Sequence, residues 1–283
     1  NRDDALLAFE RHATSKLSTA KDLLEISTLG FRGEALPSIA SVSRLLLETR
    51  TSTEVSGTLV EFAGGKILRC EEGGFPPGTA ISVKDLFFNV PARKKFLRSD
   101  QTELAHIASL VTHYSLAHPG KDFLLTSDGR DLLHVTAVED SRARVFQVFG
   151  SQLLRDLVEI GEVESILEVR PPAPPPWARP EGEEYVPPEP EAKPFRLSGF
   201  VSGPHVQKAN RNSIFLFVNR RLIKDRLLLH ALSSAYHNLI PPKTFPFALL
   251  FLDCSFDEVD VNVHPSKTEG RFRHPSFVHD SLR

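Results

Sequence analysis

The first third of the chain contains four short segments rich in apolar residues, which predict β-strands. They cover residues 44–49, 58–62, 67–70 and 79–83. Gly64-Gly65 separates two of these segments, and Asp128-Gly129 separates a later pair of apolar runs. Both dipeptides suit the tight turns of β-hairpins because their residues tolerate positive φ. The pattern therefore predicts hairpins in this part of the chain.

Apolar residues at helical spacing predict a helix at each end of this region. The first helix follows Asp3 and Asp4, whose carboxylates favour a helix N-terminus. Its apolar positions are Ala5, Leu6 and Phe9. The second helix follows Asp100, with Glu103 in an arrangement similar to a capping box. Its apolar positions are Leu104, Ile107, Val111 and Tyr114.

The last third of the chain shows the same mixture of patterns. Residues 213–219 and 247–252 have the composition of buried strands, and valines alternate with polar residues from 259 to 264. Between the strands at 213–219 and 247–252 the spacing predicts a helix. The apolar residues of one helix face are Leu228, Leu232, Ala235 and Leu239. Helices and strands without an internal repeat predict layers of the α/β or α+β class.

A proline-rich stretch interrupts the second half of the chain. Ten of the 24 residues from 171 to 194 are proline, and five more are glutamate. Proline lacks the backbone donor that a sheet needs, so we expect an extended connection here. We place a first domain at residues 1–138 and a second at 139–283, with the stretch 171–194 inserted into the second.

Composition narrows the classes of protein that fit. The 283 residues carry a net charge of −2, so DNA or RNA contacts must come from local basic patches. Cys70 and Cys254 are far apart, which excludes a disulfide framework and favours a reducing compartment. No apolar run is long enough for a membrane span, so we expect a soluble intracellular protein without membrane partners. The chain contains no Met, so Asn1 is expected to be a processed or internal position.

Two segments near the N-terminus could bind phosphate. Gly30 and Gly33 flank Arg32 just before a predicted short helix, where free backbone N–H groups favour an anion. From chemistry alone, a turn that caps a helix is equally expected, because neither known glycine-rich phosphate motif is present. Thr14 and Ser15 offer hydroxyl groups, which could bind phosphate or cap the first helix.

Basic residues concentrate in two clusters and at one corner. The clusters could contact a phosphate backbone or could be solvated surfaces. They consist of Arg93, Lys94, Lys95 and Arg98, and of Arg220, Arg221, Lys224 and Arg226. Lys267 follows Pro265 at the end of the alternating strand, from where it could reach a phosphate. From the residues alone, a solvated lysine in a turn is the more usual interpretation. The histidines show no metal-ligand spacing, so we expect no transition-metal site, and serine hydrolysis has no supporting motif.

Five segments together resemble the N-terminal region of the MutL family of DNA mismatch repair proteins. The match runs in order across nearly the whole chain. The segments are RHATSK at 11–16, LGFRGEAL at 29–36, DLFFNVPARKKFL at 85–97, FVNRRLIKD at 217–225 and DVNVHPSKTE at 260–269. The resemblance implies an incomplete GHKL-type α/β sandwich, followed by a smaller domain with a left-handed βαβ crossover. It also implies an ATP-dependent clamp that binds DNA.

The resemblance assigns roles to particular residues. The nucleotide-binding set comprises Thr14, Ser15, Gly30, Phe31, Arg32, Gly33, Glu34, Ala35, Leu36, Thr79 and Lys267. Lys267 matches the family lysine that reaches the γ-phosphate from the second domain. The DNA-binding set comprises Arg220, Arg221, Lys224 and Arg226. The implied cofactors are ATP and Mg²⁺.

The same resemblance implies partners and a location. The partners are duplex and single-stranded DNA, a MutS-type mismatch sensor, a downstream nuclease or helicase, and a second copy in a homodimer. The location is the bacterial cytoplasm. A gyrase-type topoisomerase subunit and a non-catalytic DNA-binding module are the alternatives. The family motifs at 29–36 and 85–97 favour the repair family over the topoisomerase.

The family's catalytic elements lie upstream of the first matching segment. There the water-activating glutamate, the Mg²⁺-binding asparagine and the adenine-reading aspartate all precede RHATSK, and only ten residues precede Arg11. We therefore expect no catalytic or metal-binding residue in this chain. We also expect that these 283 residues alone neither bind ATP tightly nor hydrolyse it, whereas the complete gene product does both.

Overall fold

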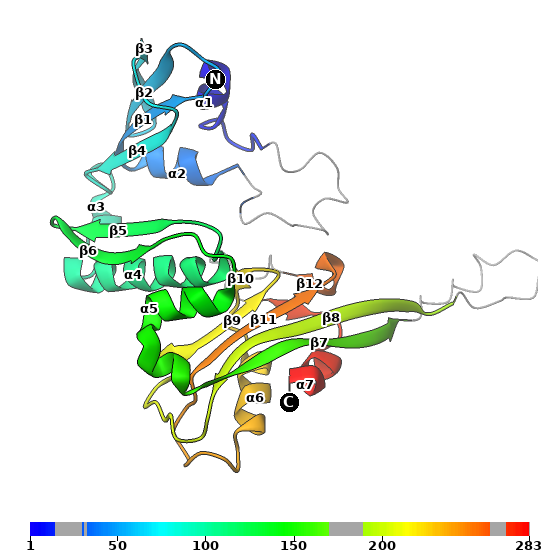
Figure 1. Cartoon of the computed structure of the whole chain (residues 1–283). Coiled ribbons are helices and arrows are strands. Elements are labelled where there is room, and N and C mark those ends of the chain that lie inside the picture. Colours follow the sequence, from blue (N-terminus) through cyan, green and yellow to red (C-terminus); the bar gives the residue numbers. More distant parts are fainter. Residues whose placement is uncertain (15–29, 31–32, 170–188, 261–269, 283) are drawn as a thin grey trace, which may run out of the picture. The chain divides into compact units, whose positions relative to one another are not determined.

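The computed structural model describes residues 1–14, 30, 33–169, 189–260 and 270–282 (Figure 1). The chain forms two compact units, Asn1–Leu104 and Ala105–Arg283, and each is described by itself. The division falls inside helix α4 (Asp100–Ala117). The domain boundary expected after residue 138 therefore does not coincide with it, and that boundary stays a prediction.

Unit 1 is built on a four-stranded antiparallel sheet with the order β3-β2-β1-β4. Its strands are β1 (Arg44–Arg50), β2 (Gly57–Ala63), β3 (Lys66–Gly73) and β4 (Gly78–Lys84). All four strands expected from the apolar segments are present. Gly64 and Gly65 join β2 to β3 with φ of 57° and 83°, which confirms the predicted turn.

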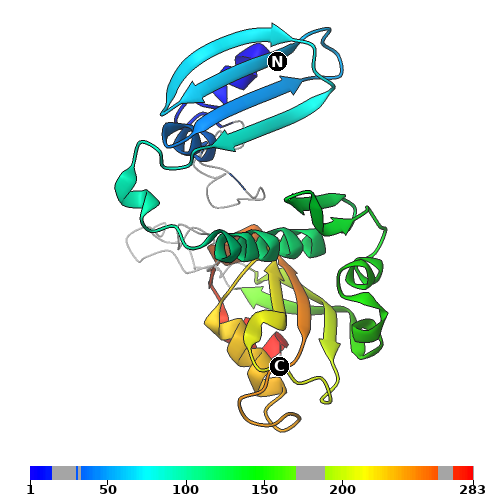
Figure 2. The same ribbon diagram turned by 90° about the vertical axis from the view of Figure 1, so that its left-hand side faces the viewer.

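Two short helices cover one face of this sheet (Figure 2). Helix α1 (Arg2–Leu7) begins where the Asn1 side chain accepts a hydrogen bond from the Asp4 N–H at 2.9 Å. Helix α2 is Ala35–Ser41, and helix α3 (Pro91–Lys94) follows the sheet. The buried core of the unit consists of Ala5, Ala40, Leu45, Leu47, Val60 and Phe62. Burial of these side chains holds the two helices to the sheet.

Part of the same sheet face remains open to solvent. Ile81 and Val83 of β4 lie directly opposite Leu47 and Leu45 of β1, so they share the face that α1 and α2 cover. Each nevertheless exposes 44% of its surface. The helices therefore cover the β1–β2 half of the face and leave the β4 edge uncovered.

Unit 2 contains a five-stranded sheet with the order β10-β9-β11-β8-β7. Its strands are β7 (Leu157–Val169), β8 (Glu191–Ser202), β9 (Ile214–Val218), β10 (Arg221–Leu222) and β11 (Ala248–Cys254). Strands β9 and β11 are parallel, and helix α6 (Arg226–Ala235) lies between them in sequence. This is the expected βαβ crossover, and its hand stays a prediction.

Helices cover both faces of the five-stranded sheet. On one face, α6 and α7 (Pro275–Leu282) bury Leu228, Leu232 and Val278 against side chains such as Leu250. On the other face, α4 and α5 (Ser141–Arg155) bury Leu116 and Val145 against a phenylalanine-rich layer. That layer consists of Phe200, Phe215, Phe217, Phe247 and Phe251. The smaller elements are β5 (Phe123–Ser127), β6 (Arg130–Val135), β12 (Val259–Asp260), β13 (Arg271–Phe272) and the 3₁₀ helices η3 (Arg211–Ser213) and η4 (Phe256–Glu258).

Two expectations about element ends were wrong. Strand β8 starts at Glu191, inside the stretch expected to be a connection, and Pro194 lies opposite Ile166 of β7. Proline fits there because β11 pairs with β8 only from Phe195 onward, so the Pro194 nitrogen needs no partner on that side. Helix α6 ends at Ala235, and Leu239 lies beyond it with 56% of its surface exposed. Residues 171–188 and 261–264 lie outside the described ranges.

Length and apolar character together decide whether a helix can span a lipid bilayer. Within the described part of the chain, no helix combines the two to the extent that a membrane span needs.

Candidate functional site

Two of the segments with family resemblance touch each other within unit 1. Gly33 has a φ of +62°, and a Cβ added to it would lie 2.2 Å from the carbonyl oxygen of Ala13. Only glycine permits both this backbone conformation and this close approach. Beside it, His12 Nδ1 lies 3.2 Å from Glu34 Oε1. The structure therefore brings residues 12–13 and 33–34 together, although 19 residues separate the two pairs in sequence.

Helix α2 starts directly after this contact. Ala35 and Leu36 form its first turn, and the Ser38 N–H donates to the Glu34 carbonyl oxygen at 3.1 Å. Glu34 occupies the cap position, but its side chain makes no capping hydrogen bond. The glycine segment thus serves as a helix start, as the capping interpretation expects. Ser15, Phe31, Arg32 and Lys267 lie outside the described residues.

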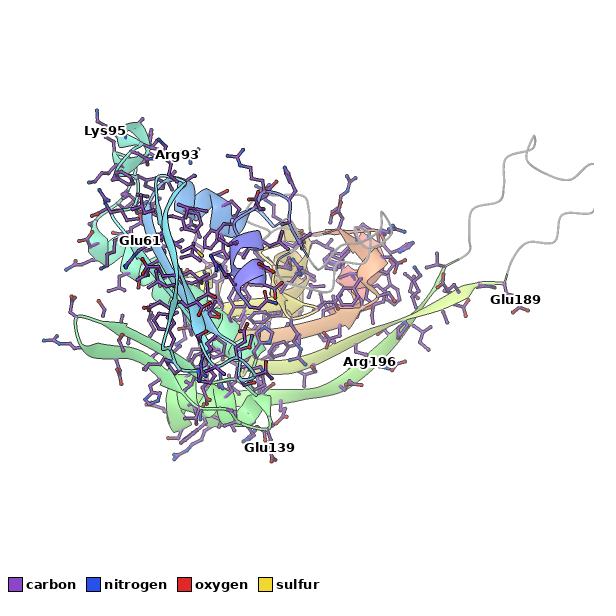
Figure 3. The ribbon with its side chains drawn as sticks, turned by 90° about the horizontal axis from the view of Figure 1, so that it is seen from above. Glu61, Arg93, Lys95, Glu139, Glu189 and Arg196 are labelled. Carbon is purple, nitrogen blue, oxygen red and sulfur yellow. The ribbon has the colours of Figure 1, made fainter. Side chains whose placement is uncertain are left out.

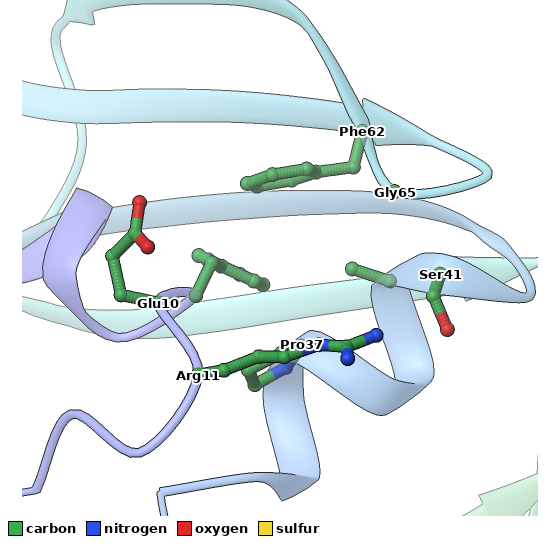
Figure 4. A pocket seen from close by; sticks show the side chains of 8 residues that line it. Glu10, Arg11, Pro37, Ser41, Phe62 and Gly65 are labelled. Atoms are coloured by element: carbon green, nitrogen blue, oxygen red, sulfur yellow. The ribbon is translucent and has the colours of Figure 1, made fainter.

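A pocket of about 380 Å³ adjoins the contact between the two segments (Figure 4). Its walls come from the residues that follow α1, from α2, from the end of β2 and from the turn between β2 and β3. They are Phe9, Glu10, Arg11, Pro37, Ala40, Ser41, Phe62 and Gly65. Figure 4 shows the Arg11 side chain alongside Pro37, extending toward Ser41. The pocket therefore combines a guanidinium and a carboxylate with aromatic walls.

None of the residues that line this pocket was expected as a binding residue from the sequence. The nearest signal was Arg11, the first residue of the RHATSK segment, which precedes Ala13 of the Gly33–Ala13 contact by two positions. Phe9 and Phe62 have ring centroids 4.2 Å apart. In the sequence they occupy apolar positions of a predicted helix and a predicted strand, which indicates core residues and not a binding site. Pocket walls built from residues far apart in sequence have no local signature.

Thr79 lies at the opposite end of the sheet from the pocket. Its hydroxyl is 2.8 Å from the Thr49 hydroxyl, and Thr49 Oγ1 also donates to the Gly78 carbonyl at 3.2 Å. Leu45 of β1 lies opposite Phe62, which lines the pocket, and Thr49, four residues further along β1, lies opposite Thr79. At about 3.3 Å per residue, Thr79 is therefore roughly 13 Å from Phe62 along the strand direction. The structure does not bring Thr79 into this pocket.

The predicted DNA-binding residues divide into exposed and buried groups. Arg220, Lys224 and Arg226 are exposed, whereas Arg221 is only 4% exposed. Burial lowers the pKa of the Arg221 guanidinium, although the nearby Tyr114 opposes this effect. Arg221 is therefore a core residue of unit 2, and we expect its substitution to destabilise the fold.

The exposed basic residues surround a strained turn next to helix α4. Asn219 and Arg220 have φ of 48° and 64°, values that favour glycine, and they connect β9 to β10. The Arg220 guanidinium lies 5.1 Å from the centre of the Phe251 ring. Burial lowers the pKa of His113, which lies on α4, and the positive charge of Lys224 lowers it further. Burial likewise lowers the pKa of His118, just after α4, and the charge of Arg220 adds to this effect. These histidines were missed because they carry no motif.

The other basic cluster belongs to unit 1. All of Arg93, Lys94, Lys95 and Arg98 are exposed around helix α3, and Figure 3 labels Arg93 and Lys95 there. The two basic clusters therefore lie on different units of the chain.

A buried charge cluster anchors the strands that flank Lys267 in sequence. Lys193 Nζ of β8 lies 2.8 Å from Glu258 Oε1 and also bonds Asp257. The other carboxylate oxygen of Glu258 is 2.7 Å from His274 Nδ1, and Glu258 is only 1% exposed. Strands β12 and β13, which start and end the segment that contains Lys267, pair with each other.

The implied Mg²⁺ can be compared with the donors that the structure offers. Among the residues with described positions, no three His, Cys, Asp or Glu side chains gather as a metal-ligand group. The described residues therefore supply no such group for Mg²⁺, and no step of the proposed function is assigned to it.

Known proteins match this chain at the level of sequence. Residues 180–283 match the family described as "DNA mismatch repair protein, C-terminal domain". The whole chain is 66% identical to the DNA mismatch repair protein MutL of Solibacter usitatus and 58% identical to that of Koribacter versatilis. The chain covers 43% and 44% of these proteins, so it spans less than half the length of the curated relatives it matches.

Solved structures agree with the sequence match. The Aquifex aeolicus MutL ATPase domain complexed with ADP is 27% identical, with a TM-score of 0.54 over 83% of this chain and 75% of that one. A structure described as the N terminal domain of a DNA repair protein gives a TM-score of 0.73 over 99% of this chain and 79% of its own. At 23% identity, that second likeness supports the α+β fold alone. The chain belongs to the MutL family of DNA mismatch repair proteins.

Proposed function

We propose that this chain supplies the nucleotide-responsive and DNA-contacting part of an ATP-dependent mismatch repair clamp. In this proposal, residues of unit 1 hold part of a GHKL-type nucleotide site, and exposed cations of unit 2 contact the DNA backbone. The observation that carries the proposal is the contact of Gly33 with Ala13, which joins two segments implied to meet the nucleotide. The ADP complex of a MutL ATPase domain is a further support.

The nucleotide role follows from what backbone and hydroxyl groups can offer a polyphosphate. The contact of Ala13 with Gly33 brings the residue before Thr14 next to the start of α2. N–H groups at such a helix start can donate to phosphate oxygens. Lys267 is proposed to add a cation at the γ-phosphate. Since a lysine is a compact point charge, it should distinguish a triphosphate from a diphosphate.

The test of this role is a comparison of ATP-analogue and ADP binding by the complete gene product. Lys267→Ala should weaken binding of a non-hydrolysable ATP analogue at least tenfold more than binding of ADP. The matched control is Lys243→Ala, an exposed lysine in a loop of unit 2. Equal losses for the two nucleotides would contradict the role of Lys267. Failure of the unaltered protein to bind either nucleotide would contradict the nucleotide site as a whole.

The DNA role rests on three exposed cations close together in sequence, Arg220, Lys224 and Arg226. Each phosphate contact releases counterions, so binding should weaken as salt rises. Lys224→Glu should lower affinity for duplex DNA and reduce the slope of its salt dependence, with unfolding unchanged. Arg221→Glu should instead unfold the unit, because it places an acidic group in the position of a buried arginine. Unchanged affinity and slope in a folded Lys224→Glu protein would remove this surface from DNA binding.

The proposed partners follow from membership of the family. They are a MutS-type mismatch sensor, a downstream nuclease or helicase, and a second copy of the protein, in the cytoplasm of a bacterium. Mass measurement of the complete gene product with and without an ATP analogue tests the second copy. Dimers that form only with the analogue support the clamp, and the same mass in both conditions contradicts it.

A further inference from the structure

Two histidines from different helices meet on the surface of unit 2. His230 of α6 and His279 of α7 are 49 positions apart, and His230 Nδ1 lies 3.1 Å from His279 Nε2. Their ring centroids are 5.3 Å apart, with 31° between the ring planes. His230 is exposed and 20% of the His279 side chain is exposed, so solvent reaches the pair.

The separation of the two nitrogens is close to that of a metal chelate. Two imidazole nitrogens bound tetrahedrally to one Zn²⁺ at about 2.0–2.1 Å from the ion are roughly 3.3 Å apart. The His230–His279 distance of 3.1 Å therefore needs to open by only a few tenths of an ångström. An ion could enter from solvent without displacing the core.

Asp280 is placed to favour the tautomer of one histidine that a metal ligand needs. His279 Nδ1 lies 3.1 Å from Asp280 Oδ1, so its N–H can donate to the carboxylate and leave the Nε2 lone pair free. A carboxylate on the far nitrogen is the usual support of a metal-binding histidine. Without an ion, the His230 Nδ1–H then donates to His279 Nε2. On binding, His230 releases this proton from Nδ1 to solvent and takes one up at Nε2, so both facing nitrogens bind the ion and no proton is lost overall.

The two helices hold the pair in a fixed relation. Leu228 and Leu232 of α6 are buried on the sheet, as is Val278 of α7. Phe277 of α7 packs on Phe195 of β8, with ring centroids 5.2 Å apart. The ligands thus sit on elements with buried anchors, so an ion loses little binding energy to ordering them.

From this geometry we propose that His230 and His279 form a binding site for a divalent transition-metal ion that ties α7 to α6. Imidazole nitrogen selects Zn²⁺, Ni²⁺ or Cu²⁺ over Mg²⁺. Among the described residues no third protein ligand joins the pair, so water occupies the remaining positions on the ion. Sequence spacing could not reveal this site because its ligands come from two separate helices. The proposal departs from the expectation of no transition-metal site, and the titration below tests it.

The test is a Zn²⁺ titration of the full chain without a histidine tag, followed by thermal unfolding and by Co²⁺ absorption. One Zn²⁺ per chain should bind and raise Tm, because binding to the folded state alone stabilises it. His230→Gln and His279→Gln should each abolish the shift. His237→Gln, which changes an exposed histidine just after α6, should retain it. Asp280→Asn should raise the Zn²⁺ concentration for half-saturation about ten- to a hundredfold.

Two outcomes would overturn the proposal. One is the absence of a saturable Zn²⁺ effect in the unaltered chain. The other is an effect of the same size in His230→Gln, whose exposed position makes it the variant that should fold normally. Circular dichroism without metal identifies folded variants, and a folded His230→Gln chain decides the question even where His279→Gln unfolds.

Discussion

Gly33 is the residue on which the contact between the two N-terminal segments depends. Gly33→Ala should destabilise unit 1 by about 1–3 kcal/mol, because alanine at positive φ is strained and its Cβ would overlap the Ala13 carbonyl. Gly74→Ala is the matched control, since a Cβ there meets no atom within 4 Å. Urea unfolding of both variants measures the difference. Similar losses for the two would show that the close approach at Gly33 has no energetic weight.

Arg144 is a second residue with a role that its sequence does not reveal. Its side chain is fully buried, and its guanidinium donates to the carbonyls of Ser115, Pro119, Lys121 and Thr136 at 2.7–2.9 Å. Burial lowers its pKa, and the nearby Asp122 opposes this effect. The guanidinium therefore satisfies carbonyls at the end of α4 and around the β5–β6 hairpin.

Replacement of this guanidinium should cost far more than replacement of its neighbour on α5. Arg144→Met leaves buried carbonyls without donors and should cost on the order of 3 kcal/mol or more. Arg142→Met removes only an exposed ion pair with Glu159 and should cost at most about 1 kcal/mol. Denaturant unfolding of the two variants provides the measurement. Equal losses would mean that water replaces the guanidinium without penalty.

At the scale of elements, the charge cluster of Lys193 with Asp257 and Glu258 joins β8 to η4. Burial acts to raise the pKa of Asp257, but the hydrogen bond and the charge of Lys193 outweigh it and hold that pKa below its usual value. For Lys193, burial acts to lower the pKa, and the two carboxylates outweigh it and raise it. Both shifts favour the charged pair in the folded state.

This cluster should make the stability of unit 2 depend on pH in the acid range. A carboxyl group whose pKa is lower in the folded state stabilises the fold at pH values above its unfolded-state pKa, which is near 3.9. That stabilisation disappears as the pH falls through the folded-state pKa. Lys193→Met should therefore flatten the decline in unfolding free energy below about pH 4. Urea unfolding between pH 3 and pH 6 checks this. An unchanged decline would assign acid unfolding to other carboxyl groups.

Most elements were predictable because their patterns are local. The four strands of unit 1, their glycine turn and the helix after Asp100 follow from period and turn chemistry. Their ends were less predictable, since tertiary contacts decide them. Pro194 joins β8 because β11 leaves that nitrogen without a partner, a fact that no local pattern contains. Leu239 continues a helical spacing but has no core to face after Ala235.

At the scale of the whole molecule, the sequence identified the candidate segments but not their geometry. Family resemblance singled out residues 11–16 and 29–36, and the structure adds that Ala13 and Gly33 touch. Burial separates Arg221 from the exposed cations around it, and a run of charges in sequence cannot show that. The histidine pair of α6 and α7 depends on the packing of two helices, so it too required the structure.

In the proposed function, the contact between Ala13 and Gly33 forms part of a nucleotide site. The most direct measurement is the affinity of the complete gene product for a fluorescent ATP analogue, compared between Gly33→Ala and Gly74→Ala. We predict at least a tenfold loss for Gly33→Ala and no change for Gly74→Ala, with both proteins folded by circular dichroism. A folded Gly33→Ala protein that binds the analogue as tightly as the unaltered protein would contradict the claim.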